Sequence, residues 1–358
     1  MYVARWILAA IVVILFFVIV WVEREKRLLV AALAEWAVPL APECAKHLAA
    51  SACAALAAPL GPPPAWAPPA GGTPPGAPAA DLAIALAYSV ALVAQTTSAT
   101  LGYGKWPTVA GAAALTAVSA PAVDPQPFAL VWAGAKLPWV VVAFRGTATA
   151  ADFIADSHYG LASPTAAIGV SLANVIGPAA AAMTSTELAG RPALPGGGAP
   201  TIHSGFAATY ADLRTSLMRA VAAAPVTVPV FIAGHSLGAA LAFLAAAEIA
   251  AQYPGRAVFV VGVAPPRVGN AAFTEWLAAR PGVAVASLIN IADLVPSLPW
   301  SYMPVLEGAP AAFAHIEPIV MISSVWPDAI GCHASPAYAA GISGASILAP
   351  AILQAPTQ

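Results

Sequence analysis

The chain has 358 residues, of which 60% are hydrophobic and only 8% are charged, and its formal net charge is −2. The few charges exclude a chain kept disordered by charge, and without a long basic run there is no case for nucleic acid binding. Three cysteines are too few for a disulfide framework, and no Cys/His cluster has zinc spacing. Cys44 and Cys53 either pair, if the segment between them loops back, or stay as free thiols.

The N-terminus carries an uncharged run of 17 residues, WILAAIVVILFFVIVWV at 6–22, between Arg5 and a charged cluster at 23–27. As a helix this run would be about 26 Å long, close to the hydrocarbon thickness of a bilayer. A cleaved signal peptide would have a shorter apolar core, followed at once by a small-x-small site, but the first Ala-x-Ala lies at 32–34. The pattern favours a retained single-pass anchor over residues 1–27. The Lys and Arg that follow the run lean toward a cytoplasmic catalytic domain.

The next segment has the composition of a linker. Residues 28–57 look helical and amphipathic at best, and residues 58–78 are almost wholly Pro, Gly and Ala, which is typical of an extended spacer without a core of its own. We therefore expect a linker over residues 28–80. A folded domain is expected over residues 81–345, where a helical stretch resumes, and a C-terminal tail over residues 346–358.

Apolar runs of strand type alternate with helical stretches through the folded domain. The strand-type runs are residues 128–132, 139–144, 226–233, 258–263 and 283–291, and the helical stretches are residues 205–224 and 237–252. Apolar strands separated by helices predict an α/β fold, with a mostly parallel central sheet covered by helices. Residues 161–200 interrupt the alternation, and we interpret them as an apolar surface insertion.

A G-x-S-x-G sequence, GHSLG at 234–238, lies directly between a strand-type run and a helix. A nucleophile elbow needs this context, because the turn forces Ser236 into a strained backbone conformation and projects its hydroxyl above the sheet. The N-terminus of the following helix would then lie under the developing oxyanion. The pattern indicates a serine nucleophile rather than a glycine-rich helix start.

A serine nucleophile needs a base and an acid, which follow Ser236 in the order acid and then His when the elbow is of this type. Two aspartates follow it: Asp293 comes directly after a strand-type run, where open α/β sheets place their sites, and Asp328 follows no clear strand. Two histidines also follow, and spacing alone does not choose between them. His333 lies in a loop with Gly, Ser and Pro, whereas His315 lies in what looks like a strand entering the core, which favours a structural role for His315.

Seven short motifs occur in order between about residue 81 and residue 338. They are FRGT at 144–147, DFIAD at 152–156, HSGF at 203–206, GHSLG at 234–238, PRVGN at 266–270, NIADLVPSLP at 290–299, and His333 with Tyr338. In this order they resemble the fungal-type, or class 3, triacylglycerol lipases of the α/β-hydrolase superfamily. The resemblance implies an α/β-hydrolase fold that needs no cofactor.

Carried over residue by residue, the resemblance implies that Ser236 is the nucleophile, Asp293 the acid and His333 the base. It also implies an oxyanion hole formed by the backbone N–H of Leu237 together with Thr147.

A lid would follow the oxyanion loop over about residues 148–158, with Phe153 and Ile154 as its apolar contacts. Phe153 stands where the family often has Trp, and the insertion at 161–200 is longer than the usual connection.

These features lead us to expect a membrane-anchored serine lipase that hydrolyses lipid esters such as acylglycerols through an acyl-enzyme. Its expected partners are the lipid ester substrate and a membrane bound through residues 6–22. The alternatives are an esterase or phospholipase that acts on other esters, and a catalytically silent lipase-like protein that binds lipid at a membrane. A complete triad in the right order argues against the silent protein, because a binding module does not need all three groups.

Overall fold

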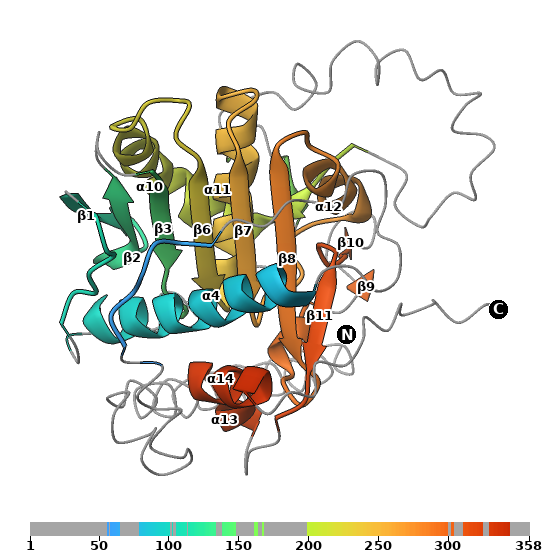
Figure 1. Cartoon of the computed structure of the whole chain (residues 1–358). Coiled ribbons are helices and arrows are strands. Elements are labelled where there is room, and N and C mark those ends of the chain that lie inside the picture. Colours follow the sequence, from blue (N-terminus) through green and yellow to red (C-terminus); the bar gives the residue numbers. More distant parts are fainter. Residues whose placement is uncertain are drawn as a thin grey trace, which may run out of the picture.

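In the computed structural model of the chain, a seven-stranded sheet lies between two layers of helices (Figure 1). The structure describes residues 56, 58–64, 79–100, 102, 105–112, 114–133, 138–147, 161–163, 167, 199–299, 302–303, 311–324 and 329–343. The expected anchor at 6–22, the two cysteines at 44 and 53, and most of the insertion at 161–200 lie outside these residues.

The strands of the large sheet lie in the order β1-β2-β3-β6-β7-β8-β11. Their bounds are β1 (Ala114–Ala120), β2 (Asp124–Ala133), β3 (Val140–Phe144), β6 (Val230–His235), β7 (Val258–Val263), β8 (Val283–Asn290) and β11 (Ile319–Ile322). Neighbours from β3 to β11 are parallel, and β1 and β2 add an antiparallel edge. The predicted mostly parallel sheet is therefore confirmed, although the edge strand β1 was not predicted.

Helices cover both faces of this sheet (Figure 1). On one face lie α4 (Ala79–Thr100) and α14 (Ser335–Ser343), and on the other lie α10 (Ser204–Val221), α11 (Leu237–Gln252) and α12 (Ala271–Ala278). The smaller elements are β4 (Leu161–Ala162) with β5 (Ile202–His203), β9 (Tyr302–Met303) with β10 (Ala311–Ala312), the 3₁₀ turn η1 (Val295–Ser297) and α13 (Ala329–His333).

Side chains of the central strands alternate between two hydrophobic cores. In β3, Val140 and Val142 pack with α10 and α11, while Val141 and Ala143 pack with α4, and all of them are buried. A strand that is covered on both faces needs an apolar residue at every position. This requirement explains why the central strands read as continuous apolar runs in the sequence.

Helix α4 is apolar along most of its length. Among the described residues it alone, over Leu82–Thr100, is long and apolar enough to cross a membrane, but half of that stretch is buried inside the folded body. Ala85, Leu86 and Val93 belong to the core beneath the sheet. This packing is typical of a core helix, so α4 gives no support to a membrane span.

A short piece of the proline-rich segment packs on α4. Leu56 and Leu60 are 2% and 5% exposed and join the core on that face of the sheet. The side-chain amide of Gln95 donates to the carbonyl oxygens of Leu56 and Ala58, at 2.9 and 2.8 Å. Leu60 also forms a bridge with Val109. The composition of residues 58–78 suggested a spacer without a core, but its first part packs onto the domain.

A buried carboxylate joins α10 to α11. Glu248 is fully buried and accepts a hydrogen bond from the Tyr210 hydroxyl at 2.8 Å, while the Arg214 guanidinium contacts both of its carboxylate oxygens. Burial raises the pKa of the Glu248 carboxyl, and the bonds to Arg214 and Tyr210 oppose that rise. The group is stable only as a complete set, because a buried charge without its partner is costly.

This cluster predicts a non-additive loss of stability. Arg214→Met leaves the Glu248 carboxylate without its charged partner and is expected to lower the free energy of unfolding by roughly 3 kcal/mol, measured in urea. The triple variant Arg214→Met/Glu248→Leu/Tyr210→Phe removes the carboxylate and these two partners, leaving only Gln252, which donates to Glu248 Oε1 at 2.7 Å from the exposed end of α11. It is expected to regain at least half of that loss. A triple variant as unstable as the sum of its three single variants would contradict the cluster.

Candidate active site

Ser236 occupies a strained turn between β6 and α11. Its φ is 56° and its ψ is −125°, a conformation that costs a residue with a side chain about 1–3 kcal/mol. The backbone N–H of Ser236 donates to the carbonyl of Val263 in β7 at 3.0 Å, and its own carbonyl accepts from Ala239 at 2.9 Å. The sheet and the helix therefore hold this turn from both sides, as expected for a nucleophile elbow.

Glycines allow the chain to approach the turn closely. A Cβ at Gly234 would lie 2.0 Å from the carbonyl oxygen of Gly238, and a Cβ at Gly238 would lie 2.2 Å from the carbonyl oxygen of Arg145. A Cβ at Gly146 would meet the Nδ1 atom of His235 at 2.8 Å and the Cβ of Ser236 at 3.4 Å. The loop after β3 thus lies directly against the serine turn, and the backbone leaves no room for a side chain at Gly234 or Gly238.

Asp293 follows β8 at the same edge of the sheet and is 5% exposed. Its Oδ1 accepts from the backbone N–H of Val295 at 2.9 Å. Its Oδ2 accepts from His333 Nδ1 at 2.8 Å and from the Tyr338 hydroxyl at 2.6 Å. Three donors thus orient one buried carboxylate toward the base segment.

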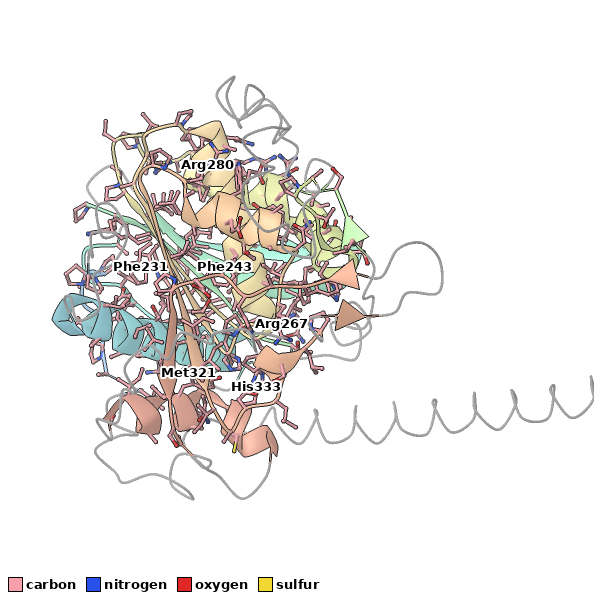
Figure 2. The ribbon with its side chains drawn as sticks, turned by 90° about the vertical axis from the view of Figure 1, so that its right-hand side faces the viewer. Phe231, Phe243, Arg267, Arg280, Met321 and His333 are labelled. Carbon is pink, nitrogen blue, oxygen red and sulfur yellow. The ribbon has the colours of Figure 1, made fainter. Side chains whose placement is uncertain are left out.

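His333 is the last residue of the short helix α13, whereas the sequence suggested a loop. The difference arises because residues 329–333 form a single helical turn before α14 begins at Ser335. A carboxylate can only accept, so Nδ1 of His333 carries the proton in this pair and Nε2 of the neutral ring is an acceptor. Figure 2 shows His333 at the same end of the molecule as Arg267 and opposite to Arg280.

His235 brings the serine turn into contact with the base segment. Its Nε2 atom lies 2.8 Å from the backbone carbonyl oxygen of His333, and the two ring centroids are 4.7 Å apart. Burial and the neighbouring His333 lower the pKa of the His235 imidazole to about 3. Because Ser236 is the next residue in the chain, the serine turn lies beside the segment that carries His333.

The loop expected to supply the oxyanion hole is held by Arg145. This side chain is fully buried, with its guanidinium over the Phe128 ring at 4.2 Å. Its Nε donates to the carbonyl of Pro127 at 2.7 Å, and its Nη1 donates to the carbonyl of Gly146 at 2.9 Å. Thr147, the next residue, is partly buried, and Leu237 is the first residue of α11. Leu237 therefore adjoins Ser236 in the chain, and Gly146, the neighbour of Thr147, lies against the serine turn.

Sequence reasoning missed two groups that support Asp293. The Tyr338 hydroxyl donates to Asp293, and burial together with the Asp293 charge raises its pKa well above the ordinary tyrosine value, so it remains a donor. The side-chain amide of Asn290 donates to the carbonyl of Cys332 at 3.0 Å and thereby ties the end of β8 to the base segment. Both residues stand in the motifs quoted above, but their contacts join positions more than 40 residues apart.

Arg267 and His315 support the turn after Asp293. Arg267 donates through Nη1 to the carbonyls of Ser297 and Pro299, the latter at 2.7 Å. His315 hydrogen-bonds to the backbone of Pro296, and burial lowers its pKa to about 4. It lies between β10 and β11 rather than in a strand, because the local pairing is a single bridge at Ala314. It does not contact Asp293 through any described hydrogen bond, in keeping with the structural role expected for it.

Two further motifs cap helices. Nδ1 of His203 accepts from the backbone N–H groups of Gly205 and Phe206 at the start of α10. The side-chain oxygen of Asn270 accepts from Phe273 N–H at 3.0 Å at the start of α12. HSGF and PRVGN thus contain capping residues that lie away from the Ser236 turn in the chain.

The expected lid residues Phe153 and Ile154 lie outside the described residues. Within the part of the chain that the structure describes, no three His, Cys, Asp or Glu side chains gather as a metal site would require.

Residues 141–303 match the family model described as lipase (class 3). This part of the chain is similar to the class 3 lipases. The lipase match includes Thr147, Ser236, Leu237 and Asp293 but ends before His333. The position of His333 beside Asp293 therefore comes from the structure.

Curated relatives of this lipase region match over part of their length. A chloroplastic phospholipase A(1), DAD1, of Arabidopsis thaliana is 30% identical over 172 residues, which are 45% of this chain and 33% of that protein. A lipase of Rhizomucor miehei is 31% identical over 104 residues, which are 27% of this chain and 28% of that lipase. The chain thus spans about a third of the length of these two relatives.

Among solved structures, a triacylglycerol lipase of Penicillium expansum aligns with a TM-score of 0.44 at 18% identity, covering 68% of this chain and 80% of that one. The strand order and the serine turn described above, rather than this likeness, identify the α/β-hydrolase fold.

The close backbone approach at Gly238 predicts that no side chain is tolerated there. Gly238→Ala is expected to lower the free energy of unfolding by more than about 3 kcal/mol, because the added Cβ meets backbone that cannot move freely. The matched control is Gly61→Ala, where an added Cβ meets no atom within 4 Å. That variant should stay within about 0.5 kcal/mol of the parent in urea unfolding. Similar stabilities for the two variants would count against the described elbow.

Proposed function

We propose that the protein is a serine-dependent carboxylic ester hydrolase that acts on lipid esters. The observation that carries the proposal is the Ser236 turn in contact with the hydrogen-bonded pair Asp293 and His333. A strained serine, a base on a segment that the serine turn contacts, and an acid that orients the base are the parts that acyl transfer requires. The similarity of residues 141–303 to the class 3 lipases supports the same reaction.

The proposed mechanism has two steps. In the first, Ser236 Oγ attacks the ester carbonyl while its proton passes to Nε2 of His333, and His333 then gives that proton to the departing alcohol. In the second, water attacks the acyl-enzyme, again through His333, and the acid and Ser236 are released. The Leu237 N–H and Thr147 stabilise the negative oxygen in both steps, and Asp293 stabilises the imidazolium of His333.

A lipid substrate is supported by the surface beside the acid. Ile291 and Leu294, which flank Asp293, are 51% and 63% exposed, and Leu298 further along is 38% exposed. Exposed aliphatic side chains clustered beside a site favour an apolar ligand over a dissolved one. The anchor proposed at 6–22 would hold the enzyme near such substrates, and the amino-acid sequence of that run supports it.

A phospholipid ester is the second candidate substrate. Three curated relatives are named phospholipase A1, and the one from Oryza sativa is 28% identical over 180 residues. Their names favour a glycerophospholipid acyl ester over a triacylglycerol. The chemistry at Ser236 is the same for both substrates.

The test is hydrolysis by the purified full chain beside its Ser236→Ala variant. Three substrates are offered: emulsified long-chain triacylglycerol, phosphatidylcholine vesicles and a dissolved short-chain p-nitrophenyl ester. Ser236→Ala is expected to lower kcat by roughly 10³-fold or more on every substrate that the parent hydrolyses, without loss of structure.

The substrate pattern separates the alternatives. A higher rate on the emulsion supports a triacylglycerol lipase, a higher rate on the vesicles supports a phospholipase, and turnover of the dissolved ester alone supports an esterase. Full activity in Ser236→Ala, or a folded parent chain that is inactive on all three substrates, would reject the proposal in favour of a silent lipid-binding protein.

Tyr338→Phe tests the support of the acid. Removal of the hydroxyl leaves Asp293 Oδ2 with one donor, and kcat on the dissolved ester is expected to fall roughly 3- to 30-fold, equivalent to about 1–2 kcal/mol. The matched control is Tyr88→Phe on α4, which removes a hydroxyl that donates to the Gly61 carbonyl at 3.3 Å. This control should keep the parent kcat. Equal kcat values for the two variants would show that the Tyr338 hydroxyl does not act through Asp293.

A further inference from the structure

The His235 ring stands where three parts of the site meet. It belongs to the serine turn itself, its Nε2 atom lies 2.8 Å from the carbonyl oxygen of His333, and its Nδ1 atom faces Gly146 so closely that a Cβ there would be 2.8 Å away. The ring is tilted by 39° against the His333 ring and meets the Tyr338 ring edge-on at 6.4 Å. One side chain thus touches the nucleophile, oxyanion and base segments.

The hydrogen bond to His333 defines the form of this imidazole. A backbone carbonyl can only accept, so Nε2 of His235 carries the proton. The ionisable groups that act on it are His333 and Asp293. Burial and the His333 charge lower the pKa of His235 to about 3, and they outweigh the Asp293 charge and the bond to the His333 carbonyl, which raise it. The ring is therefore neutral at ordinary pH, and it cannot replace His333 as the base while Nε2 is engaged.

Two bonds tie the base segment to the acid side of the site. Asp293, which follows β8, holds the imidazole of His333, and Asn290 at the end of β8 holds the preceding carbonyl of Cys332. The bond from His235 ties the base segment to the turn that carries Ser236.

We propose that His235 is a positioning residue, whose Nε2–H bond to the His333 carbonyl sets the spacing between the nucleophile and the base. The role rests on the proposed function, because the spacing matters only if Ser236 and His333 react together. A loose Ser–His distance lowers the rate of the chemical step and is expected to leave KM unchanged, since Nε2 of His235 bonds to the protein backbone. A side chain that only filled space would have no such selective effect.

Three variants separate the effect of the hydrogen bond to the His333 carbonyl from the effect of side-chain packing. They are His235→Gln, His235→Asn and His235→Leu. Glutamine carries an N–H donor at about the reach of imidazole Nε2, asparagine carries the same group short of that reach, and leucine has no donor. The readouts are kcat and KM of the full chain on the dissolved p-nitrophenyl ester, with thermal unfolding of each variant. The parent and Ser236→Ala are measured in the same assay.

His235→Asn and His235→Leu are expected to lower kcat roughly 10- to 100-fold with KM within about two-fold, and His235→Gln is expected to stay within about five-fold of the parent. If His235→Leu does not fold, the comparison of Gln with Asn still decides. A parent-like kcat in His235→Asn, or an equal loss of kcat in Gln and Asn, overturns the positioning role.

A second measurement is independent of turnover. In ¹⁵N-histidine NMR spectra of the full chain, the imidazole signals that are lost in His235→Gln belong to His235. They should have the chemical shifts of the neutral Nε2–H tautomer and should not change between about pH 5 and 9. Titration of that ring within this range overturns the inference. Loss of turnover in Ser236→Ala establishes the hydrolase separately, so a failure of the His235 predictions would leave the proposed function standing.

Discussion

The turn at Ser236 brings α11 so close to β3 and β6 that two positions can carry no side chain. Gly234 and Gly238 meet the backbone of their neighbours at distances that exclude a Cβ. The rest of the site depends on this approach. It forces Ser236 into its positive φ, places the first N–H groups of α11 beneath the serine, and brings the loop at Gly146 against the turn.

The parallel sheet then gathers the remaining groups at one edge. Thr147 follows β3, Ser236 follows β6, Asp293 follows β8, and the base segment follows β11, so all four leave from the carboxyl ends of parallel strands. Backbone carbonyls on these segments serve as the attachment points, accepting from Arg145, His235, Asn290 and Arg267. The Asp293 carboxylate, Nδ1 of His333 and the Tyr338 hydroxyl are therefore buried with hydrogen-bond partners, as a low-dielectric interior requires.

The local parts of this arrangement could be predicted from the sequence. The bounds of α11 and β7 coincide with the predicted residues 237–252 and 258–263, because both are continuous apolar stretches with clear ends. Strand β1 was not predicted, because its side chains, ALTAVSA, are mostly small and do not alternate clearly between apolar and polar. The bonds of Tyr338, Asn290 and His235 were missed because they join segments distant in the chain, and no periodicity records such contacts.

The packing of Leu56 and Leu60 against α4 limits the distance between the folded domain and any anchor at the N-terminus of the chain. The bonds from Gln95 to the carbonyls of Leu56 and Ala58 show that the folded body includes Leu56, so a tether starting after residue 27 would end no later than residue 55, rather than at residue 80. An extended chain spans at most about 3.5 Å per residue, so this shorter tether would reach at most roughly half as far as one that ends at residue 80. Any pull on it would act first on α4, and through α4 on the face of the sheet opposite to α11.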